Sequence, residues 1–272
     1  MTEAVLNSFI HNNKIYNVSE FDNIYSEKFP SIYEVIRIID KVPIFLEEHY
    51  ERLKHSAEII GYKLNLSIES IKENINKMIE LNYVDNYNIK IVLNDFNLNL
   101  NEYYYFIKST YPEPKMYKEG VKACLYHAVR ENPNAKIINA ELRNEINNIL
   151  NKGKYYEAIL VNNGEITEGS RSNIFFIKDD SLYTSPLSKV LPGITRQKIL
   201  NLCQKNNINI YEYPIYANEI ESYDAAFISG TSPKVLPISK INDISFNTQN
   251  KLLLKIMNLY DEEIKIYISK QK

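Results

Sequence analysis

The sequence predicts a fold of the α+β class. The chain has 272 residues, 44% of them hydrophobic, which is enough apolar material for one large core or two smaller ones. Strand and helix patterns follow one another without a regular βαβ rhythm, which argues against a doubly wound parallel sheet. Residues 110–115 contain Pro112 and Pro114 and show no apolar periodicity, so we interpret them as a linker.

Before this linker, alternating runs of β-branched and aromatic residues predict strands, and apolar residues at helical spacing predict helices. The first prediction is a strand pair around the turn at Asn12 and Asn13. Gly61 stands near the end of the first helical pattern, where glycine commonly terminates a helix. The predicted strands are 9–18 (the pair), 33–39, 87–93 and 103–108, and the predicted helices are 44–62 and 68–81.

After the linker the predicted strands are shorter and are separated by turn residues. Four of the seven glycines, Gly164, Gly169, Gly193 and Gly230, fall in one stretch of this half, which indicates special backbone requirements there. The predicted strands are 121–129, 157–161, 172–177, 182–184 and 225–229, and the predicted helices are 140–152, 195–206 and 252–266.

Composition argues against several classes of protein. The formal net charge of -2 gives no electrostatic reason to expect a nucleic-acid partner. No apolar run approaches the roughly 20 residues that span a bilayer, and the first residues do not resemble a signal peptide. Cys124 and Cys203 have mostly apolar neighbours, so we expect two buried thiols and a cytoplasmic location. The four histidines show no metal-ligand spacing, so no metal site is expected.

Phosphate loops, dinucleotide-binding glycine motifs and hydrolase nucleophile elbows are absent, but three other segments suggest chemistry. LPGITR at 191–196 precedes a helix, where free N–H groups suit a phosphate, although a plain capped helix start is the alternative. In ISGTSP at 228–233, an apolar strand is followed by glycine and hydroxyl residues. Such a segment can bind an anion, although an ordinary turn is the alternative. In 164–176, Glu168 precedes an apolar strand and needs either a cationic partner or solvent.

Together these segments resemble the signature of the class IV aminotransferases, the fold-type IV pyridoxal phosphate enzymes. The resemblance rests on 167–176, 184–187 and 191–196, and it extends to 33–37 and 45–56. That family includes branched-chain and D-amino acid aminotransferases and 4-amino-4-deoxychorismate lyases. The resemblance implies a homodimer and a two-domain fold. Its parts are an α/β N-terminal domain at 1–109, a linker at 110–115 and a barrel-like domain at 116–272 that binds the cofactor.

The resemblance also assigns roles to individual residues. Lys136 matches the catalytic lysine that forms a Schiff base with pyridoxal 5'-phosphate, although without the resemblance it is one surface lysine among many. Arg52 matches the arginine that binds the cofactor phosphate, and Glu168 the carboxylate that pairs with the pyridine nitrogen. The other cofactor-binding positions are Ser172, Asn173, Gly193, Ile194, Thr195, Thr231 and Ser232.

Substrate recognition is less specified by the sequence. Tyr33, Arg37 and Tyr105 are candidates for contact with the substrate, while the alternative for Tyr105 is a strand with tyrosine on both faces. Branched-chain enzymes place a tyrosine five residues after the lysine, where this chain has Glu141. D-amino acid enzymes carry an Arg-x-His pair before the linker, which 101–106 lacks.

Three hypotheses follow for the activity. The first is an aminotransferase that moves an amino group between an amino acid and a 2-oxo acid. The second is a 4-amino-4-deoxychorismate lyase, which eliminates pyruvate. The third is a binding protein without catalytic activity.

Overall fold

The computed structural model describes residues 3–28, 30–96, 100–129 and 133–272, and the chain divides into two compact units. The first unit comprises Met1–Thr110, Ala135–Ile138 and Ile264–Lys272, and the second comprises Tyr111–Asn134 and Asn139–Glu263. The sequence predicted two domains that are contiguous along the chain. Two short segments from beyond the linker instead cluster with the first unit, because they form contacts that leave no trace in local sequence patterns.

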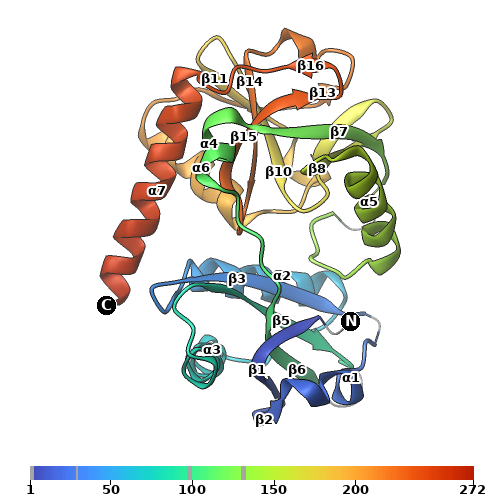
Figure 1. Ribbon diagram of the computed structural model, residues 1–272, viewed down its shortest axis with the longest axis vertical. Coiled ribbons are helices and arrows are strands. Elements are labelled where there is room, and N and C mark those ends of the chain that lie inside the picture. The colour runs from blue at the N-terminus through green and yellow to red at the C-terminus, as the bar shows by residue number, and fades with distance from the viewer. Residues whose placement is uncertain (1–2, 29, 97–99, 130–132) are drawn as a thin grey trace. The chain divides into compact units, whose positions relative to one another are not determined.

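The first unit contains a six-stranded antiparallel sheet in the order β2-β1-β6-β5-β3-β4 (Figure 1). The hairpin of β1 and β2 turns at Asn12 and Asn13, which both have positive φ, as the sequence predicted. The strands are β1 (Ala4–His11), β2 (Lys14–Asn17), β3 (Ile32–Ile39), β4 (Val42–Pro43), β5 (Tyr87–Asn94) and β6 (Asn101–Ile107). The helices are η1 (Val18–Glu20), α1 (Phe21–Ile24), α2 (Leu46–Ile59) and α3 (Ile68–Asn82).

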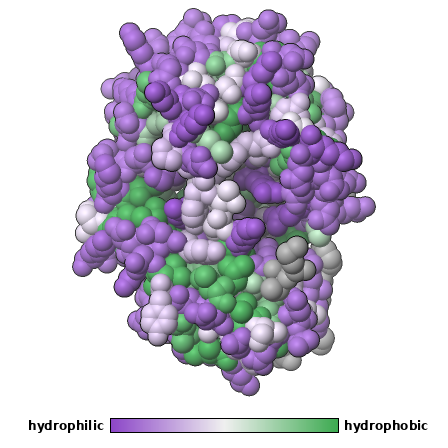
Figure 2. All heavy atoms as spheres, viewed as in Figure 1, coloured by the Kyte–Doolittle hydropathy of each residue, from purple (hydrophilic) through white to green (hydrophobic). Residues whose placement is uncertain are grey.

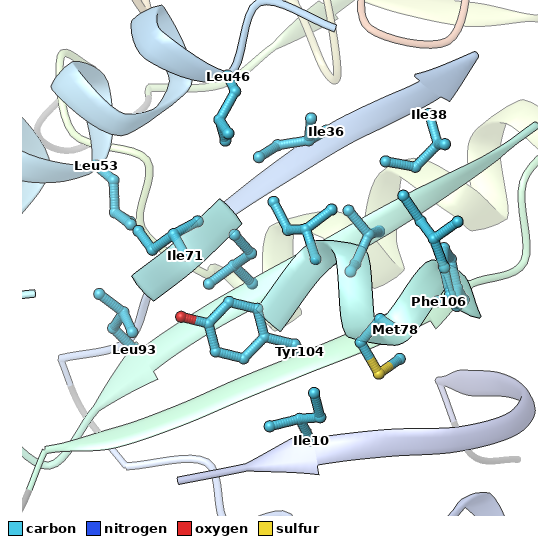
Figure 3. Close-up of a cluster of buried hydrophobic side chains, with 14 of the residues drawn as sticks. Ile10, Ile36, Ile38, Leu46, Leu53, Ile71, Met78, Leu93, Tyr104 and Phe106 are labelled. Carbon is cyan, nitrogen blue, oxygen red and sulfur yellow. The ribbon is translucent and has the colours of Figure 1, made fainter. Parts of the chain in front are cut away.

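Two hydrophobic cores flank this sheet. On one face α2 and α3 contribute apolar side chains spaced three and four residues apart, and Figure 3 shows Leu46, Leu53, Ile71 and Met78 pointing toward the strands. The Ser67 hydroxyl accepts a hydrogen bond from the Ser70 N–H and caps the start of α3. The other face is rich in aromatic rings. Its buried core contains Phe9, Phe21, Tyr33, Tyr103 and Tyr105, together with Ala4, Val92 and Ile138.

The three consecutive tyrosines of β6 are divided between the two cores. Tyr103 and Tyr105 pack in the aromatic core, whereas Tyr104 packs in the core beneath α2 and α3. This confirms the interpretation of a strand with tyrosine on both faces, since successive side chains of a strand point to opposite sides of the sheet.

The second unit contains a ten-stranded sheet with both parallel and antiparallel pairs, in the order β12-β11-β10-β14-β15-β7-β8-β9-β13, with β16 paired to β15. Its strands are β7 (Val121–His127), β8 (Glu157–Asn162), β9 (Glu165–Gly169), β10 (Asn173–Lys178), β11 (Ser181–Thr184), β12 (Ile210–Glu212), β13 (Ile215–Tyr216), β14 (Ala225–Gly230), β15 (Lys234–Ile241) and β16 (Ile244–Ser245). Its helical segments are α4 (Pro114–Glu119), α5 (Ala140–Gly153), η2 (Leu187–Lys189), α6 (Ile194–Lys205) and η3 (Ile220–Ser222). Helix α7 (Lys251–Gln271) begins in this unit, and its last residues cluster with the first.

Strand β15 lies in the middle of this sheet, although the sequence did not predict it. Pro237 obscures the strand signal because proline cannot donate a backbone hydrogen bond. Pro237 faces Phe227 of β14, while the parallel pairing with β7 begins only at Ile238, so the proline precedes the stretch that is paired on both sides. Helix α4 also begins inside the predicted linker, with Pro114 in its first turn, where a missing N–H costs nothing.

Most of the visible surface is hydrophilic, with scattered hydrophobic patches (Figure 2). Both cysteines are buried and free, as expected, and burial raises the pKa of the Cys203 thiol to about 12. No helix in the described ranges is both long and apolar enough to cross a bilayer.

Candidate functional site

Lys136 is held at the edge of strand β3 in the first unit. The Tyr33 N–H donates to the Lys136 carbonyl (3.0 Å), the Ile138 N–H donates to the Ser31 carbonyl (3.1 Å), and Ile32 and Ile137 form an antiparallel bridge. The Lys136 N–H donates to the Ser56 hydroxyl at 3.2 Å. This isolated bridge and these hydrogen bonds hold the backbone on both sides of the lysine.

The Lys136 side chain is half-buried and lies against an aromatic ring. Its Nζ atom is 4.7 Å from the centre of the Tyr33 ring, which is a cation–π distance. Tyr33 is itself buried, so its ring is fixed by its core neighbours. The sequence predicted both residues for the site, and the structure brings them together within one unit.

A buried ionic cluster of Glu34, His49 and Arg52 lies in the same unit. Glu34 follows Tyr33 on β3, so its side chain points to the opposite face, toward helix α2. Arg52 donates through Nε to one Glu34 oxygen (2.7 Å) and through Nη2 to the other (2.6 Å). The His49 Nδ1 atom is 2.6 Å from the second oxygen. All three side chains are at most 7% exposed, so this two-point pairing orients the guanidinium firmly.

The charges in this cluster shift its pKa values. Burial alone would raise the pKa of Glu34, but the Arg52 guanidinium and then His49 outweigh it and lower that pKa from 4.5 to about 2. Burial lowers the pKa of His49 below its usual 6.5, against the opposing effect of Glu34. We therefore expect a Glu34 carboxylate and a neutral His49 near pH 7, with the Nδ1–H of the histidine donated to the carboxylate. Lys136 and Arg52 both add to the lowering at His49, so the cluster and the lysine are electrostatically coupled.

The aromatic face of the sheet carries the three predicted substrate-contact residues. Tyr33 and Arg37 project from β3 to this face, and Tyr105 projects from β6. Tyr105 is fully buried and donates its hydroxyl to Glu3 Oε2 at 2.8 Å. Lys90 stands between these strands, opposite Val35 and Tyr105, and is only 2% exposed. Lys90 lies in the apolar run of β5 with no motif around it, so the sequence gave no sign of it.

In the second unit, the segment LPGITR forms the start of helix α6. Gly193 is the N-cap, and no side chain caps the helix there, so the first N–H groups of Ile194 and Thr195 keep the anion-binding character of a helix N-terminus. A Cβ atom at Gly193 would collide with Oδ1 of Asn173. Thr195 is buried, and its Oγ1 atom lies 3.2 Å from the Tyr260 hydroxyl.

Glu168 and Asn173 hold this segment from two sides. The Leu191 N–H donates to Glu168 Oε2 at 3.1 Å, and Asn173 Nδ2 donates to the Leu191 carbonyl at 3.0 Å. Glu168 is 2% exposed and Asn173 is 5% exposed. The structure thus brings three predicted cofactor-binding elements together: Glu168, Asn173 and the start of α6.

Glu157 is a second buried carboxylate in this unit, and the sequence gave no sign of it. It accepts hydrogen bonds from the Ser172 hydroxyl (2.8 Å) and from the Ser170 N–H (3.1 Å), and it is 4% exposed. The predicted role of Ser172 in cofactor binding must therefore compete with this bond. We interpret Glu157 as the residue that shapes the turn between β9 and β10.

The predicted segment ISGTSP forms the end of β14 and the turn into β15. Thr231 and Ser232 lie in this turn and are half-buried. Ser229 precedes them, pairs with Asn173 across the strands and is 1% exposed. Its hydroxyl has no hydrogen-bond partner among the described residues. A buried hydroxyl without a partner is costly, and a ligand with polar oxygens would satisfy it.

The predicted residues are thus divided between the two units. Lys136, Arg52, Tyr33, Arg37 and Tyr105 belong to the first. Glu168, Ser172, Asn173, Gly193, Ile194, Thr195, Thr231 and Ser232 belong to the second. Within the described ranges, no group of three or more histidine, cysteine, aspartate or glutamate residues is arranged to hold a metal ion.

Comparison with known proteins gives consistent relatives. A D-alanine aminotransferase of Staphylococcus epidermidis is 32% identical over 258 residues, covering 89% of this chain and 90% of the relative. The branched-chain amino acid aminotransferase of Escherichia coli superposes with a TM-score of 0.83 at 21% identity, covering 96% of this chain and 95% of that one. A candidate 4-amino-4-deoxychorismate lyase from Legionella pneumophila superposes at 0.79 with 21% identity, covering 90% and 97%.

These solved structures confirm the predicted fold class, with its mixture of helices and sheets in two parts. The family model for amino-transferase class IV matches residues 31–241, a range that includes Lys136, Glu168 and both glycine-containing turns. The chain belongs to the class IV aminotransferase family.

Proposed function

We propose that this protein is a pyridoxal 5'-phosphate-dependent aminotransferase in which Lys136 is covalently linked to the cofactor. Family membership supports the class of enzyme, and the structural observation that carries the proposal is the placement of Lys136. Its backbone N–H and carbonyl are both hydrogen-bonded, a third bond holds nearby Ile138, and its amine lies against Tyr33 in the same unit as Arg52. A surface lysine without a function would not need such anchoring.

The residues present fit this cofactor. Its phosphate is a dianion, and suitable partners within the second unit are the N-terminus of α6 and the hydroxyls of Thr195, Thr231 and Ser232. Ser229 adds a buried hydroxyl that needs a partner. The absence of a side chain at Gly193 lets Asn173 pack directly against this turn.

Each functional side chain then has a definite task. The bound cofactor supplies an aldehyde and an electron-accepting ring. Lys136 would hold that aldehyde and, as a free amine, would move a proton to or from the substrate carbon as a general base and acid. The Glu168 carboxylate holds a proton on the ring nitrogen, and its burial strengthens that interaction. Glu34 and His49 hold the Arg52 guanidinium in place.

Several further predictions belong to this proposal. The substrates are an amino acid and a 2-oxo acid, the protein forms a homodimer, and it works in the cytoplasm. These remain predictions from the sequence and the family resemblance.

The decisive experiment traps the cofactor on its lysine. The purified protein is loaded with pyridoxal 5'-phosphate, reduced with borohydride, digested and mapped by mass spectrometry. We expect a visible absorbance band before reduction and a single labelled peptide that contains Lys136. Lys136→Met should abolish the band and the label, while Lys152→Met, at an exposed position on α5, should leave both unchanged. A label on any other lysine would refute the proposal.

A second experiment separates transfer from elimination. The loaded enzyme is incubated with 2-oxoglutarate and either D-alanine or L-valine. These two donors are chosen because the similar proteins are named as D-alanine and branched-chain amino acid aminotransferases. Formation of glutamate supports the aminotransferase. Release of pyruvate from 4-amino-4-deoxychorismate, without glutamate formation from either donor, would support the lyase instead.

A further inference from the structure

Tyr260 is a polar residue on an otherwise apolar face of helix α7. In the part of this helix that belongs to the second unit, Leu253, Ile256 and Tyr260 are buried at the three- and four-residue spacing of a core-facing stripe. A phenylalanine would fill the same space with the same ring. The buried hydroxyl of Tyr260 is costly unless it forms a hydrogen bond, so its partner indicates why a tyrosine stands here.

That partner is Thr195, in the first turn of helix α6. The Tyr260 hydroxyl lies 3.2 Å from Thr195 Oγ1, and the two residues are 4% and 5% exposed. Burial raises the pKa of Tyr260 above its ordinary value of 10, so the phenol keeps its proton at neutral pH and can donate it. Helix α7 thus delivers one hydrogen-bond donor to a hydroxyl proposed above as a phosphate ligand.

The backbone acceptors near Thr195 are already engaged. A threonine hydroxyl in a helix can donate to a carbonyl three or four residues earlier, which here belongs to Pro192 or Leu191. The Leu191 carbonyl accepts the Gly193 N–H at 2.7 Å and Asn173 Nδ2 at 3.0 Å. The Pro192 carbonyl accepts a side-chain amide from further along α6 at 3.1 Å. This arrangement favours a partner outside the helix for the Thr195 hydrogen.

A hydroxyl group can accept one hydrogen bond and donate another at the same time. When Tyr260 donates to Thr195 Oγ1, the hydrogen of Thr195 is directed away from Tyr260 and is available to an anion at the start of α6. Hydrogen bonds in such a chain polarise one another, so Thr195 also becomes a stronger donor. A phenylalanine in place of Tyr260 would supply neither effect.

We propose that Tyr260 is a positioning residue for phosphate binding, and that its hydroxyl orients the Thr195 hydroxyl toward the cofactor phosphate. The inference rests on the proposed function and adds to it a residue that lies outside all three segments named by the family resemblance. Tyr260 itself touches neither the reacting atoms nor the substrate. Its effect should therefore appear in the affinity for the phosphate group and should depend on Thr195.

The experiment separates the phosphate from the rest of the cofactor. The cofactor-free protein is titrated with pyridoxal 5'-phosphate and with pyridoxal, which lacks the phosphate, and the growth of the visible absorbance band gives a Kd for each. Tyr260→Phe should raise the Kd for pyridoxal 5'-phosphate about 3- to 10-fold, the loss expected for one hydrogen bond, and leave the Kd for pyridoxal within about twofold. An equal rise in both values would refute the inference, because the tyrosine would then support only the fold.

A double-mutant cycle tests whether Tyr260 acts through Thr195. Thr195→Val removes the hydroxyl but keeps the shape of the side chain, and it should raise the Kd for pyridoxal 5'-phosphate about 10-fold or more. In that background, Tyr260→Phe should change the Kd by less than about twofold, because no hydroxyl is left to orient. A full additional loss in the double variant would show that Tyr260 acts by another route and would overturn the inference.

Tyr223→Phe is the matched control. Tyr223 is a buried tyrosine of the same unit with a side-chain hydrogen bond to Tyr213, so the variant removes a comparable hydroxyl at another place. It should lower the free energy of unfolding in urea about as much as Tyr260→Phe does, but change neither Kd. If Tyr223→Phe weakened the binding of pyridoxal 5'-phosphate to the same extent, the effect of Tyr260→Phe would be a general loss of stability and the inference would fail.

Inorganic phosphate distinguishes this inference from the proposed function. Calorimetry of phosphate binding to the cofactor-free protein involves no aldehyde and no reaction at Lys136. Weaker binding to Tyr260→Phe than to the wild type, together with a borohydride label on another lysine, would contradict the function but support the positioning of Thr195. Equal binding to both proteins, or binding to neither, with Lys136 correctly labelled, would refute only the inference about Tyr260.

Discussion

Replacement of Glu34 by glutamine should expose how strongly the buried cluster stabilises the first unit. Glu34 accepts two hydrogen bonds from Arg52 and one from His49, and its pKa falls from 4.5 to about 2. At about 1.4 kcal/mol for each pH unit, this drop corresponds to about 3 kcal/mol of stabilisation of the carboxylate. A neutral amide leaves the guanidinium buried without a counterion, so we expect Glu34→Gln to cost about 3 kcal/mol at pH 7.

The same reasoning fixes the pH dependence. A carboxyl group whose pKa is lower in the folded protein contributes stability above its ordinary value of 4.5, and this contribution is lost as the pH falls toward 2. The difference in unfolding free energy between the wild type and Glu34→Gln should therefore be constant from pH 7 to 5. It should shrink below pH 4.5 and nearly vanish near pH 2.

Urea unfolding followed by far-ultraviolet circular dichroism suits this measurement, since the chain contains no tryptophan. Glu51→Gln is the matched control, because Glu51 lies on the same helix and pairs with Lys54 at 3.2 Å, but its side chain is 67% exposed. It should change the unfolding free energy by less than about 0.5 kcal/mol. A loss no greater than that of the control at pH 7, or one that persists undiminished at pH 3, would refute the reasoning.

Three further predictions concern the second unit. Gly193→Ala places a methyl group against Asn173 Oδ1. It should therefore lower the free energy of unfolding in urea by about 1–3 kcal/mol and weaken cofactor binding in a fluorescence titration. An unchanged free energy of unfolding and an unchanged affinity would show that the turn adapts freely. In Glu168→Gln, the amide oxygen can still accept the Leu191 N–H, but the neutral side chain cannot hold a proton on a ring nitrogen. We therefore expect kcat to fall at least 10-fold, with the melting temperature nearly unchanged. A variant as active as the wild type would contradict the role of Glu168 at the ring nitrogen. Cys203, whose pKa is about 12, should react with iodoacetamide at pH 8 about three orders of magnitude more slowly than a free cysteine, as measured by peptide mass spectrometry, and denaturation should remove the difference.

The sequence predicted local elements well because their signals are local. The apolar spacing of α2 and α3 predicted both helices, and the turn at Asn12 and Asn13 predicted the first hairpin. Strand β15 was missed because a proline argues against a strand in a sequence. In the sheet, Pro237 is tolerated because it precedes the residues of β15 that are paired on both sides. Such an exception depends on which strands are paired, and strand pairing is not written in a local pattern.

The candidate site was predictable to the extent that the family resemblance named its residues. The resemblance assigned roles to Lys136 and Glu168, but it did not show that Glu34 orients Arg52 or that Glu157 binds Ser172. The two partners of each such contact are fifteen or more residues apart in the sequence. Only tertiary structure brings them together, which is why buried ion pairs are poorly predicted from a single sequence.

The distribution of charge explains why each of these contacts matters for a cofactor of this kind. Pyridoxal phosphate carries a dianionic phosphate and a ring nitrogen that works best when protonated. Within the second unit, the N-terminus of α6 suits the phosphate, and the buried anion Glu168 suits the ring nitrogen. Glu34 cannot itself serve as the partner of the ring nitrogen, because both of its oxygens are occupied by Arg52 and His49. Glu168, by contrast, accepts the Leu191 N–H through Oε2 and is 2% exposed, and it is the buried carboxylate beside the start of α6 that we propose for this role.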